Sequence, residues 1–402
     1  MTATLIENVR ALRPGEGPVG LSVLIRDGRI AAIDPPGAPA GAERVDGGGH
    51  LLTPGLIDVH IHGIGGHCFE SGPRALLDGL ALLPRWGVTC VLPTLYRCMD
   101  GEDRLADLAD LAAALGESAG AVAAGLHLEG PFLALPGAGA AVRAGDRRWL
   151  DRLLDAAGGR VSAMSISPDT PGILPVIERL VAAGVRPVIT HTRATAEQTD
   201  AAIAAGACHA THFYDVFAPP PEGDAGVRPA GAVEAILADP SVSVDFIADG
   251  VHVHPAAIRA ALAAKGPRGV LLISDANVGA GLPAGIHATP WGFDVRTAPA
   301  TAARIHRPGA ADHGMLAGSC LTMNQAVANV MRWVDLPAHE VWAMASRYVA
   351  DRFGLTSKGD LRCGADADLV LWDTSGDAPA ALSTWIGGVR VHRTAAPLET
   401  TP

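Results

Sequence analysis

Two histidines separated by one residue follow the first strongly apolar run of the chain. Residues 54–63 read PGLIDVHIHG, and residues 56–61 are apolar and largely β-branched except for one aspartate. Such a run predicts a buried β-strand, on which side chains two residues apart point to the same face. His60 and His62 would therefore project together, as the ligands of a metal ion do. Two packed or surface histidines would give the same pattern, so further ligands are needed.

Several later apolar runs also end in side chains that bind metal ions. The candidate ligands at these ends are Glu129, His191, His212 and Asp275. Each has an ordinary explanation, such as helix capping by Asp275 or a core position for His191. Together with His60 and His62 they place six candidate ligands at five predicted strand ends, a coincidence that favours a metal centre.

The types of ligand indicate the metal and the reaction. Imidazoles and carboxylates without a cysteine cluster suit zinc, iron, manganese or cobalt. Glu129 could bridge two ions, with the His-x-His pair on one and with His191 and His212 on the other. Asp275 has two compatible roles, weak ligation of the first ion and acceptance of a proton from water. A bound metal lowers the pKa of its water to about 7 and polarises a carbonyl group, so the pattern predicts a hydrolase.

Eight short apolar runs alternate with alanine- and leucine-rich segments between residues 54 and 354. The predicted strands are 56–61, 88–94, 121–128, 161–166, 185–190, 207–211, 242–247 and 270–274. Helical patterns fill the intervals, for example at 74–83, 103–115 and 196–205. Eight βα units predict an α/β fold, a TIM (β/α)8 barrel, whose functional residues gather at the carboxyl ends of the strands. An open doubly wound sheet is the alternative, but no GxGxxG motif follows the first strand.

The two ends of the chain carry strand and turn patterns but little helical pattern. Two strand-like runs flank an Asp-Gly turn within residues 21–33, and further strand-like runs lie at 368–372 and 389–391. We therefore expect residues 1–53 and 355–402 to pair into one small β-domain beside the barrel.

Composition excludes several kinds of partner. The 402 residues contain 31 Lys and Arg against 42 Asp and Glu, a net charge of −11, without a basic run, so we expect no nucleic acid. No apolar run reaches the about 18 residues that span a membrane, and the first residues lack a signal-peptide pattern. The six cysteines are scattered and form no CxxC pair. These features predict a cytoplasmic protein with a small-molecule substrate and no membrane partner.

Eight segments around the predicted strand ends carry a resemblance to a known family. They are PGLIDVHIHG (54–63), GVTCVLPTL (87–95), GLHLEGPFLA (125–134), ITHTRATAEQ (189–198), GACHATHFYDVF (206–217), IADGVHVHP (247–255), LLISDANVGAG (271–281) and MLAGSCLTM (315–323). The chain resembles the amidohydrolase superfamily at these segments, and within it the N-acetylglucosamine-6-phosphate deacetylases. The segments span most of the predicted barrel, and the resemblance implies a TIM barrel with a flanking β-sandwich built from both termini.

The resemblance implies an enzyme that hydrolyses the N-acyl bond of an acetylated amino sugar, namely N-acetylglucosamine 6-phosphate. It also implies Glu129, His191 and His212 as metal ligands, Asp275 as the catalytic acid and base, and His252 as a residue that contacts the substrate. Members of this family are commonly dimers, so a homodimer is expected.

The number of metal ions depends on the His-x-His pair. His60 and His62 match the version of the family that holds a second ion. We therefore expect two divalent ions per subunit rather than one, with zinc preferred over iron, manganese or cobalt. Because all six ligand positions are present, a non-catalytic barrel that acts as a scaffold is disfavoured.

The segments that would contact the substrate depart from the family pattern. Residues 135–140 lack the histidine of the family's Lys-Gly-Ala-His segment, and Asp215 lies where the family has Phe-Asn-Ala-Met. The family's phosphate-binding arginine is replaced by an acidic segment, so Arg228 is the nearest candidate. Leu316 lies in a segment whose backbone could face the acyl group, although a helix start explains it equally well. These departures keep an alternative open, a different amide, cyclic amide or deaminase substrate on the same metal core.

Overall fold

A computed structural model describes residues 3–12, 18–99, 101–137 and 140–394. None of the helices in these ranges has the length and apolarity needed to cross a membrane.

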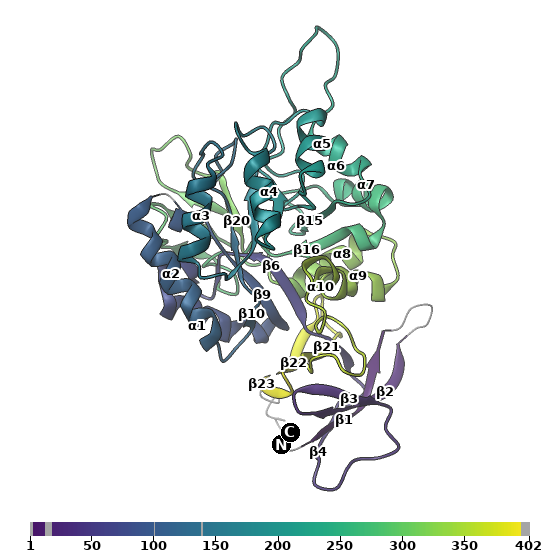
Figure 1. Cartoon of the computed structure of the whole chain (residues 1–402). Coiled ribbons are helices and arrows are strands. Elements are labelled where there is room, and N and C mark those ends of the chain that lie inside the picture. Colours follow the sequence, from purple (N-terminus) through teal and green to yellow (C-terminus); the bar gives the residue numbers. More distant parts are fainter. Residues whose placement is uncertain (1–2, 13–17, 100, 138–139, 395–402) are drawn as a thin grey trace.

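A barrel of parallel strands forms the centre of the molecule, which confirms the predicted fold class (Figure 1). Its strands are β6 (Leu56–Ile61), β9 (Val88–Leu95), β10 (Val122–Ala123), β11 (Leu126–Leu128), β12 (Val161–Ile166), β13 (Arg186–Ile189), β14 (His209–Ala210), β15 (Ser243–Ile247) and β16 (Val270–Ile273). Each lies within a predicted run or within one residue of it. The run at 121–128 is divided into two short strands at Gly125, whose φ of +132° interrupts regular strand geometry. Both pair with β9.

The barrel closes where β6 meets β16, through hydrogen bonds near the strand ends. The amide of Asp275 donates to the carbonyl of His60 at 2.9 Å. Deeper in this seam the buried carboxylate of Asp58 accepts hydrogen bonds from the amide and the hydroxyl of Ser274, at 3.2 and 2.5 Å. Burial raises the pKa of Asp58 to about 7 against the opposing effect of these hydrogen bonds. The seam therefore brings the His-x-His strand beside the strand that precedes Asp275.

Helices form a layer around the barrel (Figure 1). They are α1 (Pro73–Leu82), α2 (Leu105–Ala114), α3 (Arg147–Ala156), α4 (Leu174–Ala182), α5 (Ala196–Ala204), α6 (Ala232–Ala238), α7 (Pro255–Lys265), α8 (Met323–Trp333), α9 (Ala338–Met344) and α10 (Arg347–Phe353). Their apolar faces are buried against the strands, as Leu76 and Leu80 of α1 are. The three helical patterns named from the sequence correspond to α1, α2 and α5.

The two ends of the chain form a second sheet, seen below the barrel in Figure 1. Its strands are β1 (Thr4–Ala11), β2 (Val19–Arg26), β3 (Arg29–Ile33), β4 (Glu43–Asp46), β5 (Leu51–Pro54), β21 (Leu369–Asp373), β22 (Ala380–Ile386) and β23 (Val389–Arg393). The antiparallel pair β5 and β21 joins the first and last segments, and Ile6, Val23, Leu52 and Trp385 share a core separate from that of the barrel. The boundaries 1–53 and 355–402 stay a prediction.

An antiparallel sheet near the barrel mouth was not predicted from the sequence. It consists of β17 (Gly285–His287), β18 (Asp294–Thr297), β19 (Ala302–His306) and β20 (Leu316–Ser319). Leu316 therefore begins a strand and not a helix. The amide of Ser319 donates to the carbonyl of Asp275 at 2.8 Å, which attaches this sheet directly to one predicted ligand. A smaller hairpin, β7 (Gly63–Ile64) with β8 (His67–Cys68), follows the His-x-His strand.

Candidate metal centre and active site

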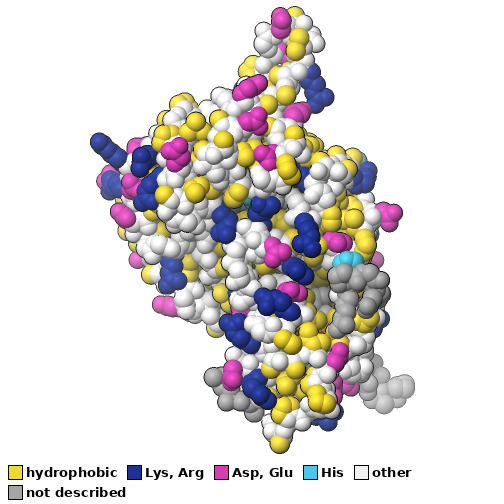
Figure 2. Space-filling model, turned by 45° about the vertical axis from the view of Figure 1, so that its right-hand side comes forward, with side chains coloured by type: hydrophobic (Ala, Val, Ile, Leu, Met, Phe, Trp, Pro, Cys, Tyr) yellow, Lys and Arg dark blue, Asp and Glu magenta, His cyan; other side chains and the backbone are white. Residues whose placement is uncertain are grey.

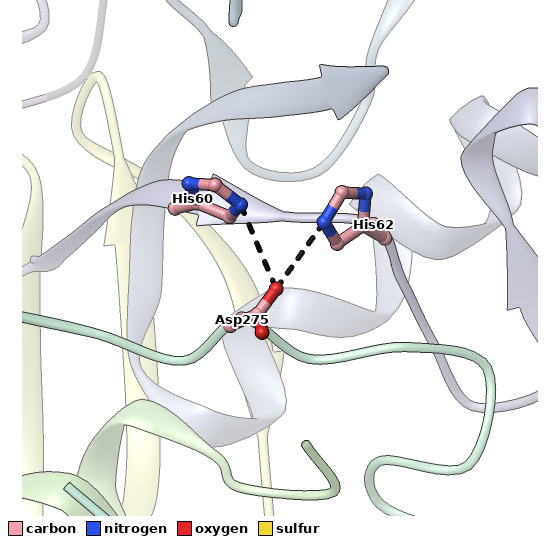
Figure 3. Close-up of side chains that lie close together, drawn as sticks. All are labelled: His60, His62 and Asp275. Atoms are coloured by element: carbon pink, nitrogen blue, oxygen red, sulfur yellow. Dashed lines mark ion pairs between the residues drawn. The ribbon is translucent and has the colours of Figure 1, made fainter. Parts of the chain in front are cut away.

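The six predicted ligands lie together at the carboxyl ends of the barrel strands. His60 and His62 come from the end of β6, and the other four residues follow β11, β13, β14 and β16. Each of the six is less than a tenth exposed. Figure 3 shows His60 and His62 pointing toward Asp275, whose Oδ1 lies 3.6 and 3.2 Å from their Nε2 atoms. Strands far apart in the sequence thus place nitrogen and oxygen donors at one point.

Glu129 lies at the centre of this cluster and faces both pairs of histidines. Its Oε2 is 3.6 Å from His60 Nε2 and 3.3 Å from His62 Nε2. Its Oε1 is 3.2 Å from His191 Nε2 and 3.0 Å from His212 Nε2. Each carboxylate oxygen therefore faces one pair of histidines, an arrangement that suits a carboxylate bridging two cations.

Two sets of three ligand atoms are compact enough to hold one ion each. His60, His62 and Asp275 form the first set, and His60, Glu129 and His212 form the second, with all atoms of a set within 4.8 Å of one another. His191 belongs to neither set, although it contacts Glu129. The sequence pattern predicts His60 as a ligand of the first ion alone, whereas in the structure His60 belongs to both sets.

The donor atoms fit a divalent metal ion. His62 Nδ1 lies 3.1 Å from the carbonyl of Thr94, so it carries the proton and leaves the Nε2 lone pair facing the cluster. The buried Nε2 of His60 has no hydrogen-bond partner in the described part of the chain. Buried polar atoms are rarely left unpaired, and imidazole nitrogen with carboxylate oxygen is a set that zinc and similar metals accept.

Contacts within the cluster shift the pKa values of the candidate ligands. Burial opposes protonation of His62, but hydrogen bonds with Asp275 and Glu129 outweigh it and raise the pKa of His62 to about 10. Glu129 likewise raises the pKa of buried His212 to about 9. The same contacts outweigh burial for the carboxyls and hold the pKa of Glu129 well below its usual range, and that of Asp275 below it as well.

Three of the candidate ligands occupy a strained backbone conformation. His191, His212 and Asp275 have φ values of +48°, +34° and +46°, although only glycine adopts this left-handed region freely. Each follows a strand end, so the chain turns sharply there and directs the side chain into the barrel mouth. Such conformations cost about 1–3 kcal/mol each and are concentrated at functional sites.

A cavity of about 400 Å³ opens above the cluster. Five of the six candidate ligands line it, and His60 lies beneath them. The predicted substrate residues Asp215, His252 and Leu316 also line the cavity. His252 Nδ1 is 2.8 Å from Asp249, which raises the pKa of His252 although burial opposes the shift.

Arg228 is not brought to the cavity. Its side chain is 88% exposed and pairs with Glu234 at 3.1 Å. The reason is the path of the chain, because residues 218–231 project from the barrel as a loop between β14 and α6 (Figure 1). Within one subunit the structure therefore does not bring Arg228 to the cavity, and its contact with a phosphate stays a prediction.

Several residues lining the cavity were missed in the sequence. Tyr96 and Trp291 pack against the ring of His62, with centroid distances of 5.5 and 6.0 Å. The partly buried carboxylate of Glu70 holds them, since it accepts hydrogen bonds from the Tyr96 amide and the Trp291 ring N–H. Tyr96 directly follows a predicted strand and could have been noticed, whereas nothing near Trp291 indicated a site.

Arg304 of β19 also lines the cavity and was missed. Of the described residues that do so, it is the one lysine or arginine, and no carboxylate lies within ion-pair distance of it in the described ranges. Its Nη1 donates a hydrogen bond to the carbonyl of Gly314 at 2.9 Å.

Residues 135–140, which differ from the family pattern, contain a glycine that the packing requires. Pro136 and Gly137 line the cavity, and a β-carbon on Gly137 would lie 1.9 Å from the ring of His191. Any other residue would displace this ligand. His127, two residues before Glu129, lies outside the cluster and faces Val59 and Ser165 at 3.0 and 2.9 Å.

Comparisons with known proteins agree with this architecture. The profile of the Amidohydrolase family matches residues 51–395. The N-acetylglucosamine-6-phosphate deacetylase of Vibrio furnissii is 32% identical, over 90% of this chain and 88% of that protein. The N-acetylgalactosamine-6-phosphate deacetylase of Escherichia coli O157:H7 is also 32% identical, over 87% and 90%.

A solved structure gives the same result. The deacetylase of Mycobacterium smegmatis in complex with N-acetyl-D-glucosamine-6-phosphate has a TM-score of 0.83 and 30% identity, covering 97% of this chain and all of that one. Members of the matched family typically bind a divalent metal. The chain therefore belongs to the amidohydrolase family and is an enzyme that hydrolyses amide bonds.

Proposed function

We propose that this enzyme removes the acetyl group of N-acetylglucosamine 6-phosphate and releases glucosamine 6-phosphate and acetate. The carboxylate of Asp275 beside four histidines and Glu129, at the base of a cavity of about 400 Å³, carries this proposal. Cavities of this size suit a single sugar ring. The relatives named above act on 6-phosphorylated acetylamino sugars, which supports the choice of substrate.

The ligands and the number of ions form part of the proposal. We assign His60, His62, Glu129, His191, His212 and Asp275 to two divalent ions, with zinc as the metal. The separate pairs of histidines on the two oxygens of Glu129 support two ions. Nitrogen and oxygen donors without cysteine support zinc, although iron, manganese and cobalt accept the same donors.

The chain's own residues perform the proton transfers. A divalent metal bound here supplies a Lewis acid that polarises the amide carbonyl and lowers the pKa of a bound water. Asp275 is ionised, since its pKa is lowered, and can accept the proton of the attacking water. It then returns this proton to the nitrogen of the leaving amino sugar, so that one carboxylate acts as base and then as acid.

Residues on the cavity wall would recognise the sugar. Tyr96 and Trp291 offer aromatic faces for the apolar side of the ring, and Asp215 can accept hydrogen bonds from hydroxyl groups. Leu316 lies at the start of β20, whose Ser319 is tied to Asp275, and it would face the acetyl group. For the phosphate we propose Arg304 together with His252, because Arg304 lines the cavity without a carboxylate partner in the described residues.

A substrate panel tests the function directly. Acetate release from N-acetylglucosamine 6-phosphate should exceed release from the unphosphorylated sugar. No acetate release from either, with ammonia released from cyclic amides or aminated rings instead, would overturn the proposal. N-acetylgalactosamine 6-phosphate should be included as a second candidate, since one relative acts on it and the two sugars differ only in the configuration of one hydroxyl.

The assembly and compartment are further parts of the proposal. We infer a homodimer from the resemblance to the deacetylases, and sedimentation of the purified enzyme would test it. A cytoplasmic location is supported by the cysteines, all six of which are free thiols. Fractionation of the producing cells would test the compartment.

A further inference from the structure

A buried aspartate that the proposed reaction does not use lies behind the metal ligands. Asp245 of β15 is fully buried, as are its neighbours His209 and Thr211. A buried carboxylate is unfavourable unless it is hydrogen-bonded, and no lysine or arginine pairs with this one in the described part of the chain. Its hydrogen bonds should therefore be specific and directed.

One oxygen of Asp245 reaches His60 through a hydroxyl group. The Thr211 hydroxyl donates to Asp245 Oδ1 at 3.1 Å, and the same hydroxyl oxygen lies 3.0 Å from His60 Nδ1. A hydroxyl has one proton, and a carboxylate can only accept, so the Thr211 oxygen must accept the proton of His60 Nδ1. This fixes the tautomer of His60, whose unprotonated Nε2 then faces Glu129 and Asp275.

The same oxygen holds the other half of the cluster through the backbone. Asp245 Oδ1 accepts a hydrogen bond from the amide of His212 at 2.6 Å. His212 has a φ of +34°, and its Nε2 contacts Glu129 Oε1 at 3.0 Å. A charged acceptor at the amide stabilises this unfavourable turn, which aims the ring at Glu129.

The second oxygen of Asp245 is fixed from behind. His209 Nε2 lies 2.8 Å from Asp245 Oδ2, and His209 Nδ1 lies 2.7 Å from the Ser243 hydroxyl. Both ring nitrogens of His209 are thus occupied, and the ring packs edge-on against Phe353. The carboxylate of Asp245 has no freedom to turn away from Thr211 and His212.

We infer that Asp245 is a positioning residue for both ion positions: it sets the tautomer of His60 through Thr211 and the backbone of His212 through its amide. This inference rests on the metal site proposed above. It predicts that a change behind the histidines weakens metal binding without removing a ligand, since outer hydrogen-bond partners typically account for about 10- to 100-fold in metal affinity.

Thr211→Val tests the first link because valine keeps the shape of threonine and removes the hydroxyl. Metal-free protein is titrated with Co²⁺, and its visible spectrum and bound metal after dialysis are measured. We expect about 10- to 100-fold weaker binding and an altered spectrum for Thr211→Val, with near wild-type behaviour for Thr211→Ser. Thr199→Val is the matched control, since this buried hydroxyl donates to the carbonyl of Thr195, the N-cap of α5, and lies away from the metal cluster.

Asp245→Asn and the double variant test the role of the carboxylate itself. If Asp245 acts partly through Thr211, the double variant should lose less affinity than the product of the two single losses. Equal Co²⁺ affinity and spectrum for Thr211→Val and Thr199→Val would overturn the inference while leaving the proposed function intact. Absence of metal binding by the wild-type enzyme would overturn both.

Discussion

The floor and the wall of the cavity are built in different ways. The floor, formed by His60, His62, Glu129, His191, His212 and Asp275, comes from the ends of barrel strands. The wall, formed by Tyr96, Trp291, Arg304, Met315 and Leu316, comes largely from the added sheet β17–β20 and the loops between its strands. Floor residues are buried, and His60, His62 and His212 form hydrogen bonds with residues outside the cluster. Arg304 and Met315 of the wall are exposed. The floor is thus suited to a fixed reaction and the wall to a choice of substrate.

The surface outside the cavity shows no comparable organisation on the face drawn in Figure 2. Acidic and basic side chains are interspersed there, and a loop projects from the top of the molecule.

The largest effect is expected for Asp275→Asn in the floor. The amide cannot accept and return the proton, so kcat per bound metal ion should fall by roughly 10²-fold or more. Steady-state kinetics with elemental analysis of the same preparation would measure both. Turnover close to that of the wild type would remove Asp275 from its proposed role.

The next effect concerns the double variant His60→Asn/His62→Asn. It removes two nitrogen donors on one side of Glu129, so the metal content should fall by about one ion per chain before the fold is lost. Elemental analysis and the far-ultraviolet circular dichroism spectrum test this together. An unchanged metal content would mean that the pair is scaffold and that the site holds one ion.

A wall variant should behave differently. Arg304→Gln removes a charged donor from the cavity, so KM for N-acetylglucosamine 6-phosphate should rise about tenfold with kcat nearly unchanged. The unphosphorylated sugar should be unaffected. Arg228→Gln is the matched control and should leave kcat and KM unchanged. A raised KM for Arg228→Gln together with an unchanged KM for Arg304→Gln would assign phosphate binding to the projecting loop.

The smallest effect is a dependence of metal-induced stabilisation on pH. The pKa values of His62 and His212 are raised from 6.5 to about 10 and about 9, so their contribution to the metal-free protein is full below pH 6.5 and is lost as pH rises through 9 to 10. Metal binding requires both rings neutral, so the Tm difference between metal-loaded and metal-free protein should grow from pH 6 to pH 9. A difference that shrinks over this range would contradict these pKa shifts.

Much of the floor could be predicted from the sequence because it depends on local pattern. Apolar β-branched runs specify buried strands, and a barrel brings the residue after each strand to one mouth, so His191 or Asp275 could be placed without coordinates. The division of residues 121–128 into two strands and the shared position of His60 depended on packing and could not be predicted.

The sequence by itself determined the barrel, the sheet formed by the two ends of the chain and the meeting of six donor side chains. Only the tertiary structure decided that Arg304 and Trp291 line the cavity, that Arg228 points away, and that Asp245 lies behind His60 and His212. The physical reason is the sequence distance over which each feature is determined. The position of a strand follows from the hydrophobic pattern of a few neighbouring residues. The direction of a loop and the partner of a buried carboxylate follow from contacts between segments far apart in the chain.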